Sequence, residues 1–112
     1  MNVTDLVPRV HGAEPFRRSQ LRFLPTVGGC YVLSTFVGNI LYIGKTVSLR
    51  RRFVEHLDTP SKLEVTALGR ASMFHWSVYD DVATLERTWM NAFILVEGAL
   101  PLINKLYSPV SI

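Results

Sequence analysis

The pattern of hydrophobic and polar positions predicts a β-hairpin near the middle of the chain. Residues 30–36 and 40–43 are rich in β-forming side chains, and Gly38-Asn39 between them is a typical hairpin turn. With a two-residue loop, Tyr42 lies opposite Thr35 and projects from the same face as Tyr31; a three-residue loop would reverse this. The relative orientation of the two tyrosines therefore depends on the loop.

A helix is predicted after the hairpin. Ser48 is a suitable N-cap, and apolar side chains recur every fourth position at Leu49, Phe53 and Leu57. Arg52 and His56 are also four positions apart, so they share a helix face at the border between core and solvent. A second helical stretch is predicted from Pro60 to near Gly69.

Residues 73–79 predict a third strand and residues 84–97 a long helix that ends at Gly98. The expected core positions of this helix are Leu85, Trp89, Phe93 and Val96. Further apolar side chains lie elsewhere around it, so we expect the helix to be deeply buried or covered by a protein partner or a second copy of the chain.

Before residue 27 the sequence has no clear periodicity. Several prolines and a glycine interrupt it, and we expect a poorly regular, basic N-terminal arm over residues 1–26, with a short helix near residues 17–23. Residues 27–112 would then form one folded domain. This arm either grips a nucleic-acid backbone or is a disordered tail.

Composition excludes several classes of protein. The chain has 112 residues, 48% of them hydrophobic, which suits one domain with a core of its own. Cys30 is its one cysteine, so neither an intrachain disulfide nor a cysteine-based zinc site is possible. No membrane-spanning or signal segment is evident. We expect a cytoplasmic protein in a reducing compartment, with nucleoid association as one option.

The net charge of +3 is modest, but the cations are clustered. One cluster comprises Lys45, Arg50, Arg51 and Arg52, and a second comprises Arg9, Arg17, Arg18 and Arg22. Such clusters attract a polyanion, although a charge run can also be a solvated helix face. The first cluster is our predicted nucleic-acid contact.

Glu86 lies early in an apolar helix, where an ionised carboxylate needs a partner. The partner is either an arginine or a divalent metal, because magnesium is often held by one or two carboxylates together with water and phosphate oxygens. Taken singly, His56, Arg52 and the two tyrosines have ordinary structural explanations. Together they are a workable set for phosphodiester hydrolysis.

At this point a family resemblance becomes visible. Gly29-Cys30-Tyr31 and Tyr42-Ile43-Gly44 resemble the two half-motifs that name the GIY-YIG nuclease family, and cysteine replaces the usual isoleucine. Arg52 and His56 match the family's arginine and following histidine or tyrosine, and Glu86 and Asn104 match its glutamate and its asparagine. The resemblance covers residues 28 to about 107 and leaves residues 1–26 unexplained.

The resemblance implies a small α/β (α+β) fold, a three-stranded antiparallel sheet flanked by helices, and a DNA endonuclease that uses one Mg²⁺ or Mn²⁺ ion. Tyr31 would be the general base, with a pKa lowered by Lys45 and Arg52. Glu86 would hold the metal, and Arg52 would bind the developing charge. His56 and Tyr42 would orient phosphate or water or relay a proton, and Asn104 would fix the site's geometry.

Two alternatives remain open. The same fold could bind nucleic acid without cutting it, or the apolar helix could make the chain an interaction protein. We expect a catalytic domain without an added DNA-binding domain, and therefore low sequence specificity or targeting by a partner or by DNA structure. The sequence does not distinguish DNA from RNA, single from double strands, or homing, restriction, repair and structure-selective roles.

Overall fold

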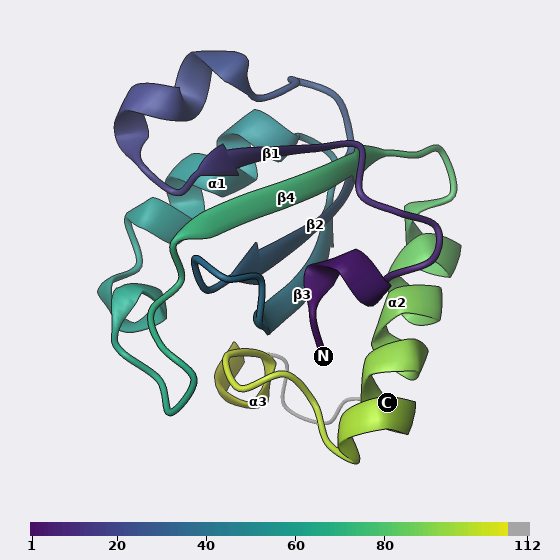
Figure 1. Ribbon diagram of the computed structural model, residues 1–112. Helices are drawn as coiled ribbons and strands as arrows, with labels where there is room; N and C mark the ends of the chain where they lie inside the picture. Colours follow the sequence, from purple (N-terminus) through teal and green to yellow (C-terminus); the bar gives the residue numbers. More distant parts are fainter. Residues whose placement is uncertain (108–112) are drawn as a thin grey trace.

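Four strands form one antiparallel sheet in the order β1-β4-β2-β3 in the computed structural model, which describes residues 1–107 (Figure 1). The strands are β1 (Gly12–Pro15), β2 (Gly29–Ser34), β3 (Ile40–Thr46) and β4 (Met73–Val78). β2 is central and pairs with β3 on one side and β4 on the other. The α+β fold is as predicted, with β1 as an additional strand.

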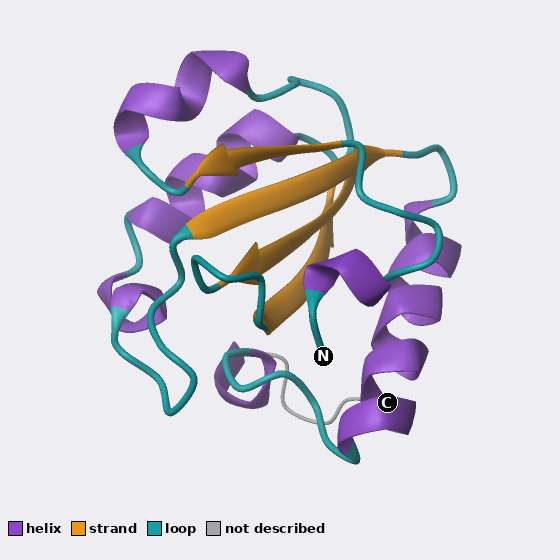
Figure 2. Ribbon diagram, in the orientation of Figure 1, coloured by secondary structure: helices purple, strands orange, loops and turns teal. Residues whose placement is uncertain are grey.

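Helices cover both faces of the sheet (Figure 2). The α-helices are α1 (Leu49–Leu57), α2 (Val82–Glu97) and α3 (Asn104–Tyr107), and the 3-10 helices are η1 (Val3–Asp5), η2 (Arg18–Phe23) and η3 (Pro60–Leu63). α1 and η2 pack on one face, and α2 and η1 on the other.

Alternation along β2 divides the core into two clusters. Tyr31 and Leu33 pack toward α1 with Phe53, while Cys30 and Val32 pack toward α2. Every residue of β2 is buried, because the strand is central and covered on both faces. Cys30 is fully buried among apolar side chains, as expected for a small substitute for isoleucine.

The hairpin loop is longer than predicted. Thr35 N–H donates to the carbonyl of Asn39 at 3.0 Å, and Gly38 takes a positive φ of 96° inside the loop. The register shifts by one residue after Leu33, so Tyr42 lies opposite Leu33 rather than Thr35. This bulge restores the alternation, and Tyr31 and Tyr42 project from the same face after all.

The segment before residue 27 contains more regular structure than expected. β1 pairs with β4, and η2 forms where the short helix was predicted. Leu6, Phe16 and Leu24 are buried in the two core clusters. Pro8 and Pro25 lie between elements, whereas Gly12 and Pro15 are the first and last residues of β1. The short elements gain their stability from packing on the sheet.

Two helix predictions also need correction. The stretch after Pro60 is helical only to Leu63, and a turn closed by Thr66 and Gly69 follows. In α2, Leu85, Trp89 and Phe93 are buried as predicted, but Val96 is exposed. Leu95 is also exposed, at 86%. The last turn of α2 therefore faces outward. Among the described residues, no helix has the length and hydropathy to cross a membrane.

Candidate active site

Three aromatic rings stack side by side across the sheet on the α1 face. The Tyr31 ring lies between those of Tyr42 and Phe74, with centroid distances of 5.9 and 5.1 Å and interplanar angles of 23° and 7°. The rings come from β2, β3 and β4, so strand pairing sets their spacing. The two predicted tyrosines are thus held together as one rigid unit.

Gly44 leaves the space that the tyrosine hydroxyl occupies. Gly44 lies opposite Tyr31 in the β2–β3 register. A Cβ at Gly44 would lie 2.5 Å from the Tyr31 hydroxyl and 2.8 Å from Cε1 of Tyr42. Any larger residue would displace both rings, which is the physical reason for glycine after the second tyrosine.

The Tyr31 hydroxyl forms a hydrogen bond with Nε2 of His56, at 2.6 Å. Both side chains are buried. Burial, followed by the neighbouring Tyr42, raises the pKa of Tyr31, and the opposing effect of Arg52 is smaller. Arg52 lowers the pKa of Tyr31 as predicted, but the net shift in the protein on its own is upward, because desolvation of the phenolate outweighs the nearby guanidinium.

His56 has a lowered pKa and is neutral at neutral pH. Burial, with the charges of Lys62 and Arg52, lowers its pKa to about 3. A neutral imidazole has one N–H and one lone pair, so the tautomer of His56 sets which of the two side chains donates in this hydrogen bond. The Nδ1 of His56 is buried and has no hydrogen-bond partner among the described residues.

Arg52 lies one helical turn before His56 and is half-buried. Its Nη1 is 3.6 Å from a carboxylate oxygen of Glu55, while its Nε is buried without a hydrogen-bond partner in the part of the chain described. An unsatisfied buried donor costs about 1–3 kcal/mol. Buried side-chain nitrogens without a partner among the described residues thus occur on both Arg52 and His56, which share a helix face.

The other predicted nucleic-acid contacts differ from one another. Arg51 is exposed, with Glu55 3.9 Å away. Arg50 instead donates through Nε to the carbonyl of Leu24 at 2.9 Å and through Nη2 to that of Arg22 at 3.2 Å. Arg50 therefore fastens the N-terminal segment to α1, a role that the charge pattern alone did not suggest.

Glu86 and Lys45 form an ion pair at 3.7 Å. Glu86 projects from α2, which packs on the face opposite α1, and Lys45 projects from β3, the edge strand. Both side chains are partly exposed. The negative charge of Glu86 still contributes to the raised pKa of Tyr31. The carboxylate is therefore close enough to the phenol for an electrostatic effect.

Asn104 binds the edge of the sheet beside the tyrosines. Its Oδ1 accepts the N–H of Ile43 at 2.9 Å, and its Nδ2 donates to the carbonyl of Ile43 at 3.0 Å. The amide thereby replaces a neighbouring strand next to Tyr42 and Gly44. Its buried position agrees with a structural role in fixing the site's geometry.

Comparison with known protein families agrees with this geometry. The sequence profile of the GIY-YIG catalytic domain matches residues 27–93, more than half of the chain. The chain belongs to the GIY-YIG family. A search among curated proteins found no match. Membership gives this chain a nuclease fold, in a family that generally acts on DNA.

GIY-YIG nucleases generally use a divalent metal, and the described residues can be compared with that requirement. Among the described residues, no three His, Cys, Asp or Glu side chains are grouped as a metal-binding set. A closed protein cage is therefore not available. Glu86 is a partly exposed carboxylate whose ion pair with Lys45, at 3.7 Å, is longer than a hydrogen bond. One such carboxylate fits Mg²⁺, which keeps water and phosphate oxygens as its remaining ligands.

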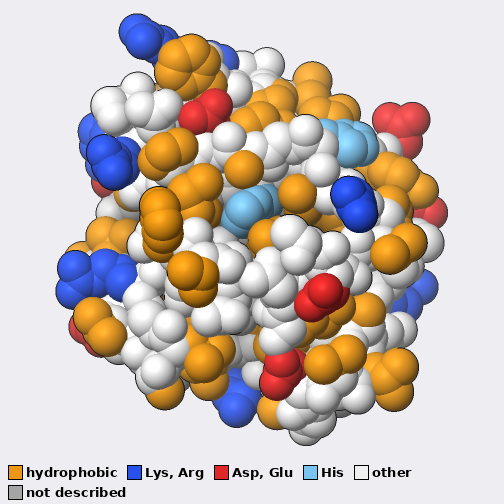
Figure 3. Space-filling model, in the orientation of Figure 1, with side chains coloured by type: hydrophobic (Ala, Val, Ile, Leu, Met, Phe, Trp, Pro, Cys, Tyr) orange, Lys and Arg blue, Asp and Glu red, His pale blue; other side chains and the backbone are white. Residues whose placement is uncertain are grey.

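Charged side chains are unevenly distributed on the face seen in Figure 3, where lysine and arginine gather along the margin over η2, α1 and η3.

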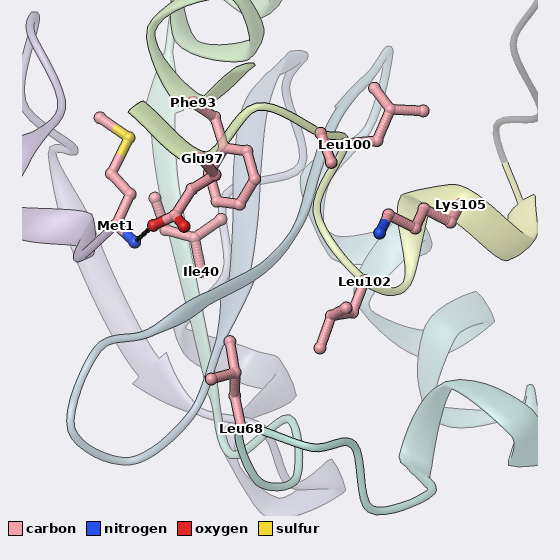
Figure 4. A pocket seen from close by; sticks show the side chains of 9 residues that line it. Met1, Ile40, Leu68, Phe93, Glu97, Leu100, Leu102 and Lys105 are labelled. Atoms are coloured by element: carbon pink, nitrogen blue, oxygen red, sulfur yellow. Dashed lines mark hydrogen bonds and ion pairs between the residues drawn. The ribbon is translucent and has the colours of Figure 1, made fainter. Parts of the chain in front are cut away.

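The cavity in Figure 4, about 150 Å³, lies elsewhere, between Ile40, Phe93 and Leu102. There the N-terminal ammonium pairs with Glu97. None of the predicted site residues lines this cavity.

Lys62 is a residue near the site that sequence reasoning missed. Its Nζ lies 5.1 Å from the centre of the Tyr42 ring, and its charge acts on His56. It belongs to η3 and is a single lysine between Pro60 and Leu63, outside the basic cluster. No pattern in the sequence indicated it, since only folding brings η3 against β3.

Proposed function

We propose that this protein is a metal-dependent endonuclease that hydrolyses phosphodiester bonds in DNA. Family membership supports the nuclease class. Within the described residues, the observation that carries the proposal is the 2.6 Å contact between the Tyr31 hydroxyl and His56, beside the unpartnered Nε of Arg52. This arrangement supports the proposal, because hydrolysis of a phosphodiester needs a route for a proton and a cationic donor close together.

The Tyr31–His56 pair gives the attacking water a route for its proton. Tyr31 accepts the proton from water while its own proton passes to Nε2 of His56, so the phenol stays neutral throughout. This relay suits a tyrosine whose pKa burial raises, because no free phenolate has to accumulate. The resulting imidazolium is stabilised by the negative phosphate once substrate is bound.

Arg52 would bind the phosphate at which charge develops. Its guanidinium presents planar donors that suit phosphate oxygens, and its buried Nε lacks a partner among the described residues. Tyr42 orients the substrate and supports Tyr31 by stacking. Asn104 acts through the backbone of Ile43 and does not contact substrate.

Glu86 would hold the divalent metal, Mg²⁺ or Mn²⁺, and Lys45 would move from Glu86 to a phosphate oxygen. A metal held by Glu86 would supply Lewis-acid chemistry at the scissile phosphate and at the leaving 3′ oxygen. Lys45 is flexible enough for this change because half of its side chain is exposed and its contact with Glu86 is long. Together with Arg51 it would contact the DNA backbone.

Replacing Glu86 tests the proposal. Glu86→Gln should reduce nicking of supercoiled plasmid with Mg²⁺ by about 100-fold or more, because a metal ion supplies several kcal/mol and each tenfold corresponds to about 1.4 kcal/mol. DNA binding should change little. Glu14→Gln, on the opposite edge strand β1, is the matched control and should cut like the parent.

Equal cutting by Glu86→Gln and the control would remove the metal assignment. If the parent protein binds DNA but cuts no member of a panel of supercoiled plasmid, single strand, branched duplex and RNA, the alternative of a silent binding module holds instead. The panel also decides between duplex, structure-directed and RNA substrates. We infer low sequence specificity, or targeting by a partner or by DNA structure, because phosphate contacts alone do not read bases.

A further inference from the structure

Lys62 is held in place by the turn that follows α1. The hydroxyl of Thr59 donates to the carbonyl of Glu55 at 2.8 Å, and the N–H of Lys62 donates to the carbonyl of Thr59 at 3.0 Å. Pro60 occupies the first turn of η3, where its fixed φ suits a helix start. The backbone therefore directs Lys62 back toward the sheet.

Its ammonium group lies against the aromatic part of the site. Nζ is 5.1 Å from the centre of the Tyr42 ring, within the range of a cation–π contact. The same ring stacks on Tyr31 and meets the His56 ring at a centroid distance of 5.2 Å. Lys62 thus borders the pair that we propose moves the proton.

Two cations come together at this point. Burial, and then the charge of Arg52, lower the pKa of Lys62, while Glu55 raises it. Lys62 and Arg52 in turn both disfavour protonation of His56. Glu55 lies 3.6 Å from Nη1 of Arg52, its charge also acts on Lys62, and half of its side chain is exposed. An anion bound between the cations would relieve their repulsion.

We propose that Lys62 and Arg52 bind the same phosphodiester group, with Lys62 as a further phosphate-binding residue of the active site. The proposal rests on the proposed function for the identity of the substrate. A lysine supplies a point charge and an arginine a planar fork, a combination that suits one phosphate. Part of the Arg52 side chain is exposed, so its guanidinium can supply donors to the same anion.

Binding measurements without metal separate this proposal from catalysis. Lys62→Met keeps the length and apolar contact of the side chain over Tyr42 but removes its charge. Affinity for a short DNA duplex in EDTA should fall about tenfold, as for loss of a charge-assisted contact. The slope of log K against log salt should decrease in magnitude by about one. Lys62→Arg should restore most of the affinity.

Lys105→Met is the matched control, because Lys105 is an exposed lysine on α3 and its loss removes the same charge. It should leave affinity and cutting nearly unchanged. With Mg²⁺, Lys62→Met should raise KM about tenfold with a smaller effect on kcat, since the contact already forms in the ground state. A thermal unfolding curve for each variant checks that the fold is intact.

Inorganic phosphate provides a readout independent of DNA cleavage. Titrated with phosphate, the parent should show a shift of the His56 imidazole signals by NMR, and Lys62→Met should need a much higher phosphate concentration. Equal DNA affinity and equal phosphate response in the parent and Lys62→Met would overturn the proposal, as would an equal loss in Lys105→Met. A parent that binds but never cuts would overturn the proposed function alone.

Discussion

At the residue scale, Tyr31 and His56 depend on each other. A buried phenol is a weak base when alone, and a buried imidazole with a pKa near 3 is a weak one too. In the proposed relay, their 2.6 Å contact compensates for this, because a proton passes along the pair without leaving a charge on the tyrosine. On this proposal the pair acts only when an anion is bound.

The buried histidines make stability depend on pH. Burial lowers the pKa of His56 to about 3 and that of His75 to about 4, so below pH 6.5 the unfolded chain binds protons that the folded protein does not. The free energy of unfolding should therefore fall between pH 6.5 and 5, approaching about 1.4 kcal/mol per pH unit for each histidine. Above pH 6.5 this contribution is fully present.

Urea unfolding of the parent and of His56→Gln at several pH values between 5 and 6.5 tests this. The variant retains only the His75 contribution, so its pH slope should be about half that of the parent. Few carboxylates titrate in this range, which keeps the comparison clean. A parent whose unfolding free energy does not vary over the range would contradict the pKa directions.

At the scale of elements, the edge strand β3 is where the site is assembled. It carries Tyr42, Gly44 and Lys45, and its outer edge is bound by residues that follow α2: Ile103 N–H donates to the carbonyl of Leu41 at 2.9 Å, and Asn104 pairs with Ile43. A free edge would be open to other pairing partners and to motion. The C-terminal segment therefore stabilises the half of the hairpin that bears the second tyrosine.

Asn104→Ala should loosen this strand. It leaves the buried N–H and carbonyl of Ile43 unpaired, which should cost about 1–3 kcal/mol of stability. Hydrogen exchange measured by NMR should show faster exchange of the Ile43 amide, whereas Lys105→Ala should leave it slow. Unchanged exchange in Asn104→Ala would mean that other contacts hold the edge.

At the scale of the whole molecule, the first 26 residues are part of the fold. β1 extends the sheet beyond β4, and Leu6 packs with the α2 cluster. The division of the chain between residues 26 and 27 remains a prediction. That the basic residues of the first part contact nucleic acid also remains a prediction. Association with a partner through the exposed end of α2 also remains a prediction, testable by light scattering.

Two adjacent substitutions measure how far the first segment contributes. Leu6 is 0% exposed and Val7 is 76% exposed. Leu6→Ala should reduce the free energy of unfolding by about 2–5 kcal/mol, as for other buried leucines, while Val7→Ala should stay within about 0.5 kcal/mol. Chemical denaturation gives both values. Equal small effects would mean that the segment is only loosely attached.

Local patterns in the sequence determined four elements: the hairpin, α1 with its Ser48 cap, β4, and α2 with its glycine end. Each of these depends on the types and spacing of a few neighbouring residues. The same is true of the family motifs. The shared face of the tyrosines was predicted only conditionally, since a bulge after Leu33 sets the register.

Tertiary structure decided what depends on distant parts of the chain. Phe74 and His56 come to Tyr31 from β4 and α1, Lys62 comes to Tyr42 from η3, and β1 joins the sheet from the first segment. The net shift of the Tyr31 pKa is upward, whereas a downward shift was predicted, because it too depends on distant parts of the chain. Charge can be read along a sequence, but the burial that outweighs it arises only when separate segments exclude water together.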